Sequence, residues 1–148
     1  MKQRYFMVII NNIEFENEVL TAPKIAYSLL DQGIWLFSSH TAKVKTLEAG
    51  DKIVIYAAGR GNRFFLGSFA LKTKPEPSEC GPAGLERLVK LFSLRSEIKE
   101  ISRWAEPKPM ADLLENLSFI KDKRNYGLYL RQGLRVLSEE DYQVIVNE

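Results

Sequence analysis

Ser38, Ser39 and His40 place a potential nucleophile directly beside a potential base. In serine hydrolases, a histidine imidazole takes the proton from the serine hydroxyl that attacks the substrate. Here the residues follow an apolar run that begins at Trp35, and successive residues of a strand point to opposite faces. The two side chains would therefore need an unusual backbone to meet. We expect instead that Ser39 or Thr41 caps the segment AKVKTL that follows. Hydrolysis or group transfer at Ser39 and His40 is a weaker alternative.

The sequence offers few ligands for a metal or a cofactor. It contains one cysteine, Cys80, and one histidine, whereas a zinc site needs several such ligands at close spacing. Gly59-Arg60-Gly61 begins like a dinucleotide fingerprint, but Phe64-Phe65 follows in place of the helix that receives the phosphates. We therefore expect no metal, no cofactor and no enzymatic activity.

Aromatic residues suggest a binding function. Five of them lie in or beside expected strands and close to polar residues: Phe6, Trp35, Tyr56, Tyr126 and Tyr129. If the strands curl together, several rings could converge on one pocket with flat walls. A planar base gains about 1–3 kcal/mol per ring by stacking, which helps to offset the cost of flipping it from a duplex. The alternative is that each ring fills the core, as most aromatic residues of a small domain do.

Basic residues gather in the middle of the chain. Between residues 38 and 74 they are Lys43, Lys45, Lys52, Arg60, Arg63, Lys72 and Lys74, against Glu48 and Asp51. The net charge of the whole chain is only +2, so the distribution is more informative than the sum. This asymmetry favours the binding of a polyanion near the central segment. A solvated surface is the alternative.

Strands and helices alternate irregularly along the chain, which predicts an α+β fold. Apolar runs predict strands at 5–10, 52–56 and 63–71, with a hairpin turn at Gly59–Asn62. Helices are expected at 24–32, between Pro23 and Gly33, at 110–117, and from Glu139 to Val146, where Ser138 opens a capping-box pattern. Residues 85–94 fit a helix or a strand equally well.

The length of 148 residues is most simply one domain, residues 1–148. No apolar run approaches the roughly 18–20 residues of a membrane-spanning helix. The single cysteine fits a reducing compartment. We expect a cytoplasmic protein that does not contact membranes and is a monomer.

Several motifs, taken in order, resemble the EVE domain of the PUA-like superfamily. They are YFMVIIN, a helix, W-x-x-x-S-x-x-x-x-V-x-x-L-x-x-GD-x-I-x-I-Y, a glycine turn, and F-x-x-G-x-F. The tail LSFIKDKRNYGLYLRQGLRVLSEEDYQVI is similar to the closing segment of small stand-alone EVE proteins. The resemblance covers nearly the whole chain.

The resemblance implies a PUA-like pseudo-β-barrel of five to six mixed strands, flanked by short helices. It also implies that Leu85–Leu94 is a strand. For function, it implies a nucleic-acid-binding module for RNA or DNA, related to readers that hold a modified base in an aromatic cage. The pocket residues carried over by position are Phe6, Asn11, Trp35, Ser38, Ser39, Tyr56, Tyr126 and Arg131.

Together these observations predict a pocket for a flipped base, modified or unmodified. Trp35 would sandwich the base with Phe6 or Tyr56, while Asn11, Ser38, Ser39 and the backbone would read its edge. Four cations, Lys43, Lys45, Arg60 and Arg63, would attract phosphates, and His40 lies in the same loop. The alternative function is a small-molecule or protein-interaction module that uses the same pocket without nucleic acid.

Overall fold

The computed structural model describes residues 3–15, 17–79, 82, 84–130 and 133–147. Its elements, with η for short 3-10 helices, are β1 (Tyr5–Ile10), β2 (Ile13–Phe15), β3 (Glu18–Leu20), α1 (Ala22–Asp31), β4 (Ile34–Phe37), η1 (Val44–Thr46), β5 (Lys52–Ala57), β6 (Phe64–Leu71), β7 (Glu76–Pro77), η2 (Glu86–Lys90), β8 (Leu94–Pro109), α2 (Met110–Leu113), η3 (Leu114–Asn116), η4 (Tyr126–Leu130), β9 (Leu134–Leu137) and α3 (Glu139–Val146).

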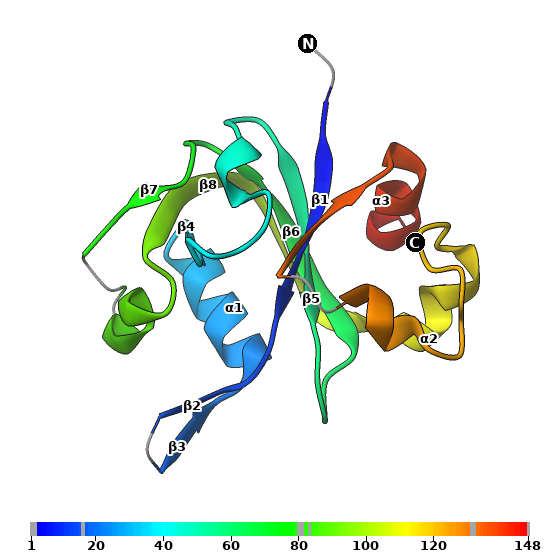
Figure 1. Cartoon of the computed structure of the whole chain (residues 1–148), viewed down its shortest axis with the longest axis horizontal. Coiled ribbons are helices and arrows are strands. Elements are labelled where there is room, and N and C mark those ends of the chain that lie inside the picture. The colour runs from blue at the N-terminus through cyan, green and yellow to red at the C-terminus, as the bar shows by residue number, and fades with distance from the viewer. Residues whose placement is uncertain (1–2, 16, 80–81, 83, 131–132, 148) are drawn as a thin grey trace.

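A mixed sheet forms the centre of the fold (Figure 1). Its strand order is β4-β8-β6-β5-β1-β9, and the short β7 also pairs with β8. β1 and β5 are parallel, whereas the other described pairs in this sheet are antiparallel. The long strand β8 pairs with β4 through its first residues and with β6 through its later ones, so the sheet curls into a half-barrel. β2 and β3 form a separate hairpin beyond the carboxyl end of β1.

The two faces of the sheet pack into two separate hydrophobic clusters. The first core includes Phe6 and Val8 of β1 together with buried residues of α1 and β4. The second core includes Met7 of β1 together with residues of α2 and α3. In Figure 1, α1 lies on one side of the sheet, and α2 and α3 lie on the other. Because side chains alternate along a strand, the position of a residue in that alternation decides which core it enters.

Helix α1 begins and ends where the sequence signals predict. The Thr21 hydroxyl accepts a hydrogen bond from the backbone N–H of Lys24 (3.4 Å), and Pro23 lies in the first turn. Beyond the helix, Gly33 has φ +71°, a left-handed conformation that glycine adopts without steric cost. The Gly33 N–H donates to the carbonyl of Leu30 (3.1 Å). This termination sends the chain directly into β4.

Gly67 allows β6 and β8 to approach closely. A Cβ atom at this position would clash with the backbone carbonyl oxygen of Ser102 on β8. The β6–β8 pairing is also irregular on both sides of Gly67, between Phe65 and Gly67 and between Ser68 and Ala70. Close packing of β6 against β8 therefore explains the glycine of the F-x-x-G-x-F pattern, because only a residue without a side chain fits here.

Asp141 attaches the C-terminal helix to the preceding loop. Ser138 caps α3 as predicted, since its Oγ accepts from the Asp141 N–H (3.1 Å). The Asp141 carboxylate does not complete a capping box. It accepts instead from the N–H and hydroxyl of Ser118 (2.8 Å each) and from the N–H of Phe119 (3.2 Å). Asp141 is 2% exposed, so these bonds satisfy a buried charge.

Most of the predicted elements are confirmed, and two segments differ. The strands β1, β5 and β6, the hairpin turn, and all three helices lie where the sequence predicts them. The expected strand at Leu85–Leu94 is wrong: η2 occupies Glu86–Lys90, and β8 begins only at Leu94. The segment YGLYL, expected in or beside a strand, forms the 3-10 helix η4. Both segments have apolar spacing that a single turn of helix also satisfies.

Candidate functional site

The basic residues predicted to act together lie at two ends of β1. Lys43 and Lys45 belong to the η1 loop, which contacts the amino end of β1 through a bond from Arg4 Nη2 to the Thr46 carbonyl (2.6 Å). Arg60 and Arg63 belong to the β5–β6 hairpin beyond the carboxyl end of β1, where Ala58 N–H donates to the Ile10 carbonyl. These basic residues therefore do not form one cluster, and their predicted contacts with phosphates stay a prediction.

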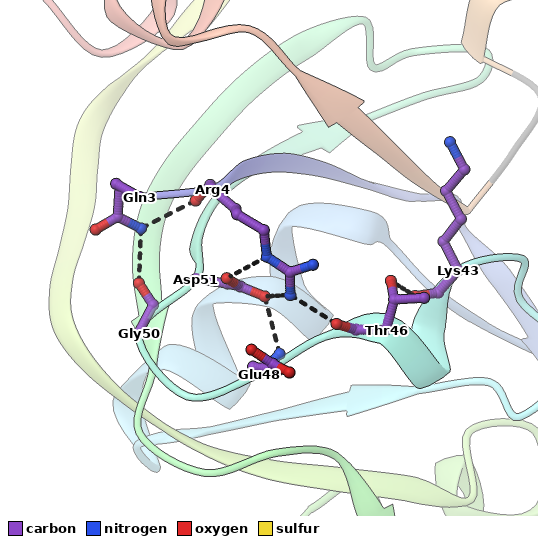
Figure 2. Close-up of polar contacts among 7 residues, drawn as sticks. All are labelled: Gln3, Arg4, Lys43, Thr46, Glu48, Gly50 and Asp51. Carbon is purple, nitrogen blue, oxygen red and sulfur yellow. Dashed lines mark hydrogen bonds and ion pairs between the residues drawn. The ribbon is translucent and has the colours of Figure 1, made fainter. Parts of the chain in front are cut away.

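A polar network attaches the η1 loop to the start of β1 (Figure 2). Arg4 donates to both Asp51 oxygens, from Nε (3.0 Å) and from Nη2 (2.5 Å), and Asp51 Oδ2 also accepts from the Glu48 N–H (2.8 Å). The Asp51 side chain is 6% exposed and that of Arg4 is 39% exposed. The hydrogen bond to Asp51 raises the pKa of the Arg4 guanidinium. The backbone that carries Lys43 and Lys45 is thus held by a charge-assisted contact that is half shielded from water.

The predicted sandwich of Trp35 with Tyr56 is wrong. Trp35 lies in the first core, is 2% exposed, and packs against Phe69 with 5.1 Å between ring centroids. Tyr56 lies in the second core, is 1% exposed, and packs against Phe65 at 4.9 Å. Phe6 is also buried in the first core and lines neither of the two cavities described below. The sheet separates the Trp35 ring from that of Tyr56.

A small apolar cavity adjoins Trp35. This Trp35 cleft has a volume of about 160 Å³, and its lining residues are Val8, Ile9, Ile10, Asn11, Ile13, Ile25, Leu29, Trp35, Leu36, Leu88 and Phe92. Asn11 supplies the one amide side chain of this lining, and the Trp35 indole carries an N–H donor. The Asn11 amide is exposed and makes no hydrogen bond within the described part of the chain. The cleft therefore combines one indole wall, an aliphatic surrounding and one free amide.

Asn12, the neighbouring residue, has a structural role. Its Oδ1 accepts from the N–H of Ala22 at the start of α1 (2.8 Å) and from Nδ2 of Asn62 in the β5–β6 hairpin (3.0 Å). Asn11 Oδ1 itself lies 3.3 Å from where a Cβ of Gly59 would be. The end of β1, the start of α1 and the hairpin therefore meet at this point, beside the Trp35 cleft.

A wider pocket lies on the opposite face of the sheet, against the β5–β6 hairpin and η4. This Tyr56–Tyr126 pocket has a volume of about 510 Å³, and its lining residues are Tyr56, Ala58, Gly59, Arg63, Arg124, Asn125, Tyr126, Gly127 and Leu130. Three predicted site residues, Tyr56, Arg63 and Tyr126, meet here. Burial raises the pKa of the Tyr56 hydroxyl, and the positive charge of Arg63 opposes this shift without cancelling it.

The remaining predicted site residues lie elsewhere. Ser38 is half-buried, while Ser39 and His40 are exposed, and none of the three lines the cleft or the pocket. The backbone N–H of His40, not its imidazole, donates to Ser38 Oγ (3.2 Å). The predicted cap by Ser39 or Thr41 is wrong, because η1 follows Lys43 without a side-chain cap. Arg131 lies outside the described residues.

Most of the lining residues were not predicted, among them Leu88 and Phe92 of the cleft and Arg124 and Asn125 of the pocket. Arg124 and Asn125 belong to a turn in which Asp122 Oδ1 accepts from both of their N–H groups (3.2 and 3.4 Å). An Asp followed by Asn three residues later is a signal for such a turn. The sequence therefore indicated the turn itself, but not that it borders a pocket.

No family model matches this sequence, and no curated protein matches it. The fold, however, is similar to several solved structures. A human THYN1 protein in complex with DNA containing 5-methylcytosine has a TM-score of 0.62 and 8% identity, covering 95% of this chain and 94% of that chain. The YTH domain-containing protein mmi1, in a complex with RNA, has a TM-score of 0.59 and 15% identity, covering 97% and 79%. A protein from Pseudomonas putida has a TM-score of 0.63 and 10% identity, covering 96% and 97%.

The fold is PUA-like. The curled mixed sheet with short helices on both faces agrees with these structures over nearly the whole chain. Identities of 8–15% show a common fold and nothing about a ligand. The prediction of the fold class is thereby confirmed, with the short β7 as an addition to the six strands of the main order.

Two further properties concern the described residues alone. None of their helices is long and apolar enough to cross a membrane. They also contain no group of three or more His, Cys, Asp or Glu side chains that could hold a metal ion.

Proposed function

We propose that this chain is an EVE-type domain that binds nucleic acid without enzymatic activity and takes one base into the Trp35 cleft. The observation that carries the proposal is the composition of the cleft. Enzymes and readers that extrude a base hold it between aromatic or apolar side chains and read its edge by hydrogen bonds. The cleft offers an indole wall, aliphatic side chains and the free amide of Asn11.

The size of the cleft supports a single base. Its volume of about 160 Å³ is below the roughly 300–1,000 Å³ of pockets for drug-sized ligands. Trp35 lines the cleft while packing against Phe69, so the wall is rigid before the ligand arrives. A rigid wall reduces the ordering cost of binding.

Solved structures with this fold support a nucleic-acid ligand. The THYN1 structure contains DNA with 5-methylcytosine, and the mmi1 structure contains RNA. In this chain, Arg60 lies in the hairpin beside Asn11 and would contact phosphates near the base. Lys43 and Lys45, at the other end of β1, would contact phosphates farther along the strand. Such contacts add affinity without reading sequence.

The test uses adjacent asparagines as matched variants. A panel of DNA and RNA oligonucleotides, unmodified or carrying 5-methylcytosine or N6-methyladenine, is titrated by fluorescence anisotropy at several salt concentrations. Asn11→Ala should weaken binding of the preferred oligonucleotide by about 1–3 kcal/mol, because the edge of the buried base loses its partner. Its melting temperature should not change, since the Asn11 amide makes no hydrogen bond in the described part of the chain.

Asn12→Ala should show the opposite pattern. It removes the bond to the Ala22 N–H and should cost about 1 kcal/mol of folding stability, with affinity retained well below the melting temperature. If Asn11→Ala binds every oligonucleotide as the parent does, the Trp35 cleft is not the base site. Binding that does not depend on salt would instead indicate a small-molecule or protein ligand, because phosphate contacts release counterions.

A further inference from the structure

We infer that the Tyr56–Tyr126 pocket is a separate nucleotide-binding site, in which Arg63 and Arg124 receive the phosphate and the Tyr126 ring receives the base. The site lies on the face of the sheet opposite the Trp35 cleft. It does not depend on the proposed function of that cleft. Its volume of about 510 Å³ falls within the range of small-molecule sites, about 300–1,000 Å³.

The charge of the pocket favours an anion. Arg63 and Arg124 are exposed, and neither guanidinium has an ion pair or hydrogen bond within the described residues. No carboxylate is among the described residues that line the pocket. Asp122, in the same turn as Arg124, accepts bonds from the Arg124 and Asn125 N–H groups and from Nδ2 of Asn125. Two unpaired guanidinium groups match the planar, bidentate recognition of phosphate.

The backbone of Arg63 is held in an unusual conformation. Its φ is +78°, in the left-handed region that residues with a side chain rarely adopt. Two hydrogen bonds fix it there: Arg63 N–H donates to the Ala57 carbonyl (2.7 Å), and its carbonyl accepts from the Met110 N–H (3.0 Å). Glycine would fit this position without strain, as at Gly59 and Gly61 in the same hairpin. Lys43 and Glu100 also have a positive φ, but of these three residues only Arg63 lines the pocket. Strained non-glycine residues concentrate at binding and active sites, which is consistent with a binding role for the Arg63 side chain.

Tyr56 supplies an independent indication of a polar ligand. Its ring is 1% exposed and packs against Phe65, yet it lines the pocket. Its hydroxyl makes no hydrogen bond to any described residue. The hydroxyl is not among the buried side-chain atoms that lack a partner, so it reaches the pocket, where it can donate to a ligand oxygen. Burial keeps this hydroxyl protonated, because it raises the pKa, so the group can donate to a phosphate oxygen.

Tyr126 provides the surface for an aromatic base. It is half-buried, packs against the second core, and begins η4 directly after the Arg124-Asn125 pair. A base stacked on the accessible face of this ring gains affinity whatever the identity of the base. The pocket therefore combines a stacking ring with phosphate donors, which is the chemistry of a nucleotide rather than of a free phosphate ion.

The experiment follows backbone amide resonances by NMR during titration with adenosine 5′-monophosphate, adenosine and inorganic phosphate. The Asn125 and Gly127 amides, which line the pocket but not the cleft, should shift saturably with the nucleotide, and about tenfold or more weakly with adenosine or phosphate alone. Tighter binding of inorganic phosphate than of the nucleotide, or no shift of these two amides, would overturn the inference.

Variants identify the groups involved. Arg63→Gly should weaken nucleotide binding about tenfold or more while leaving the melting temperature equal or higher, because glycine relieves the positive φ. Tyr56→Phe should retain the fold and weaken binding about threefold to tenfold. Lys99→Ala, which removes one exposed charge on β8, is the control for net charge. If Arg63→Gly and Tyr56→Phe bind the nucleotide as Lys99→Ala does, the assignment is wrong.

The two titrations distinguish a failure of this inference from a failure of the proposed function. If the mononucleotide shifts the pocket amides while no oligonucleotide binds the chain, the inference stands and the proposed function fails. If oligonucleotides bind in an Asn11-dependent manner while mononucleotides do not shift the resonances of the pocket amides, the proposed function stands and the pocket is not a nucleotide site.

Discussion

Replacement of Trp35 by alanine should be costly for folding. The side chain is 2% exposed, and its ring packs against Phe69 with 5.1 Å between ring centroids. Removal of a buried tryptophan costs about 3–5 kcal/mol, because the lost burial adds to the cost of the cavity left behind. The cleft of about 160 Å³ beside the ring already lacks filling atoms, so the two spaces would merge and the upper half of this range is expected.

Thermal unfolding followed by circular dichroism measures this cost. At about 2–4 °C per kcal/mol for a chain of this size, the melting temperature of Trp35→Ala should fall by about 8–20 °C. Trp104 is the matched control, since it is the other tryptophan, is only half-buried, and donates from Nε1 to Ser102 Oγ (3.2 Å). Trp104→Ala should cost about 1–2 kcal/mol.

Trp35→Phe separates folding from binding. It keeps a flat ring beside the cleft and should retain most of the affinity for the preferred oligonucleotide when measured well below its melting temperature. A Trp35→Ala protein that melts within about 2 °C of the parent would refute the assignment of this ring to the core, since a loss that small is typical of surface substitutions.

Two further outcomes concern stability. Asp51→Asn should cost about 1.5–3 kcal/mol, because it weakens the charge-assisted bonds from Arg4; a melting temperature unchanged from the parent would mean that the network in Figure 2 does not stabilise the fold. Burial raises the pKa of the Tyr27, Tyr56 and Tyr142 hydroxyls above the ordinary value of 10.0. The unfolded chain then loses protons near pH 10 that the folded chain keeps, so stability should fall as the pH rises above about 10. Melting curves between pH 8 and about 11.5 test this, and Tyr56→Phe should reduce the fall.

Local signals made much of the fold predictable. Pro23 and Gly33 bracket α1, the run from Lys52 to Tyr56 forms β5, and the Gly59–Asn62 turn connects β5 to β6. Each of these is determined by residues next to one another in the chain. Residues 85–94 lacked such a signal, because their apolar residues fit either period and the outcome depends on what they pack against.

The candidate site was less predictable because it depends on register between distant strands. In the parallel pair of β1 and β5, Phe6 lies opposite Ile53, whereas Tyr56 lies opposite Ile9. The offset of three residues is odd, and side chains alternate with a period of two, so the rings of Phe6 and Tyr56 point to opposite faces. The sequence identified aromatic and basic residues that do line cavities. The strand register, however, places Trp35 at the Trp35 cleft and Tyr56, Arg63 and Tyr126 at the Tyr56–Tyr126 pocket.

Residues at the two ends of β1 are expected to have different roles, folding stability at one end and ligand binding at the other. At its amino end, Arg4 and Asp51 form a shielded ion pair that attaches the η1 loop. At its carboxyl end, the Asn11 amide has no partner in the described part of the chain, and the adjoining hairpin carries Arg63 in a strained conformation. A strained backbone lowers stability unless a ligand compensates for it, whereas the exposed Asn11 amide is solvated by water and adds no such cost. Substitutions at Arg4 or Asp51 should therefore change the melting temperature more than the affinity, whereas substitutions at Asn11 or Arg63 should change the affinity and leave the melting temperature equal or higher.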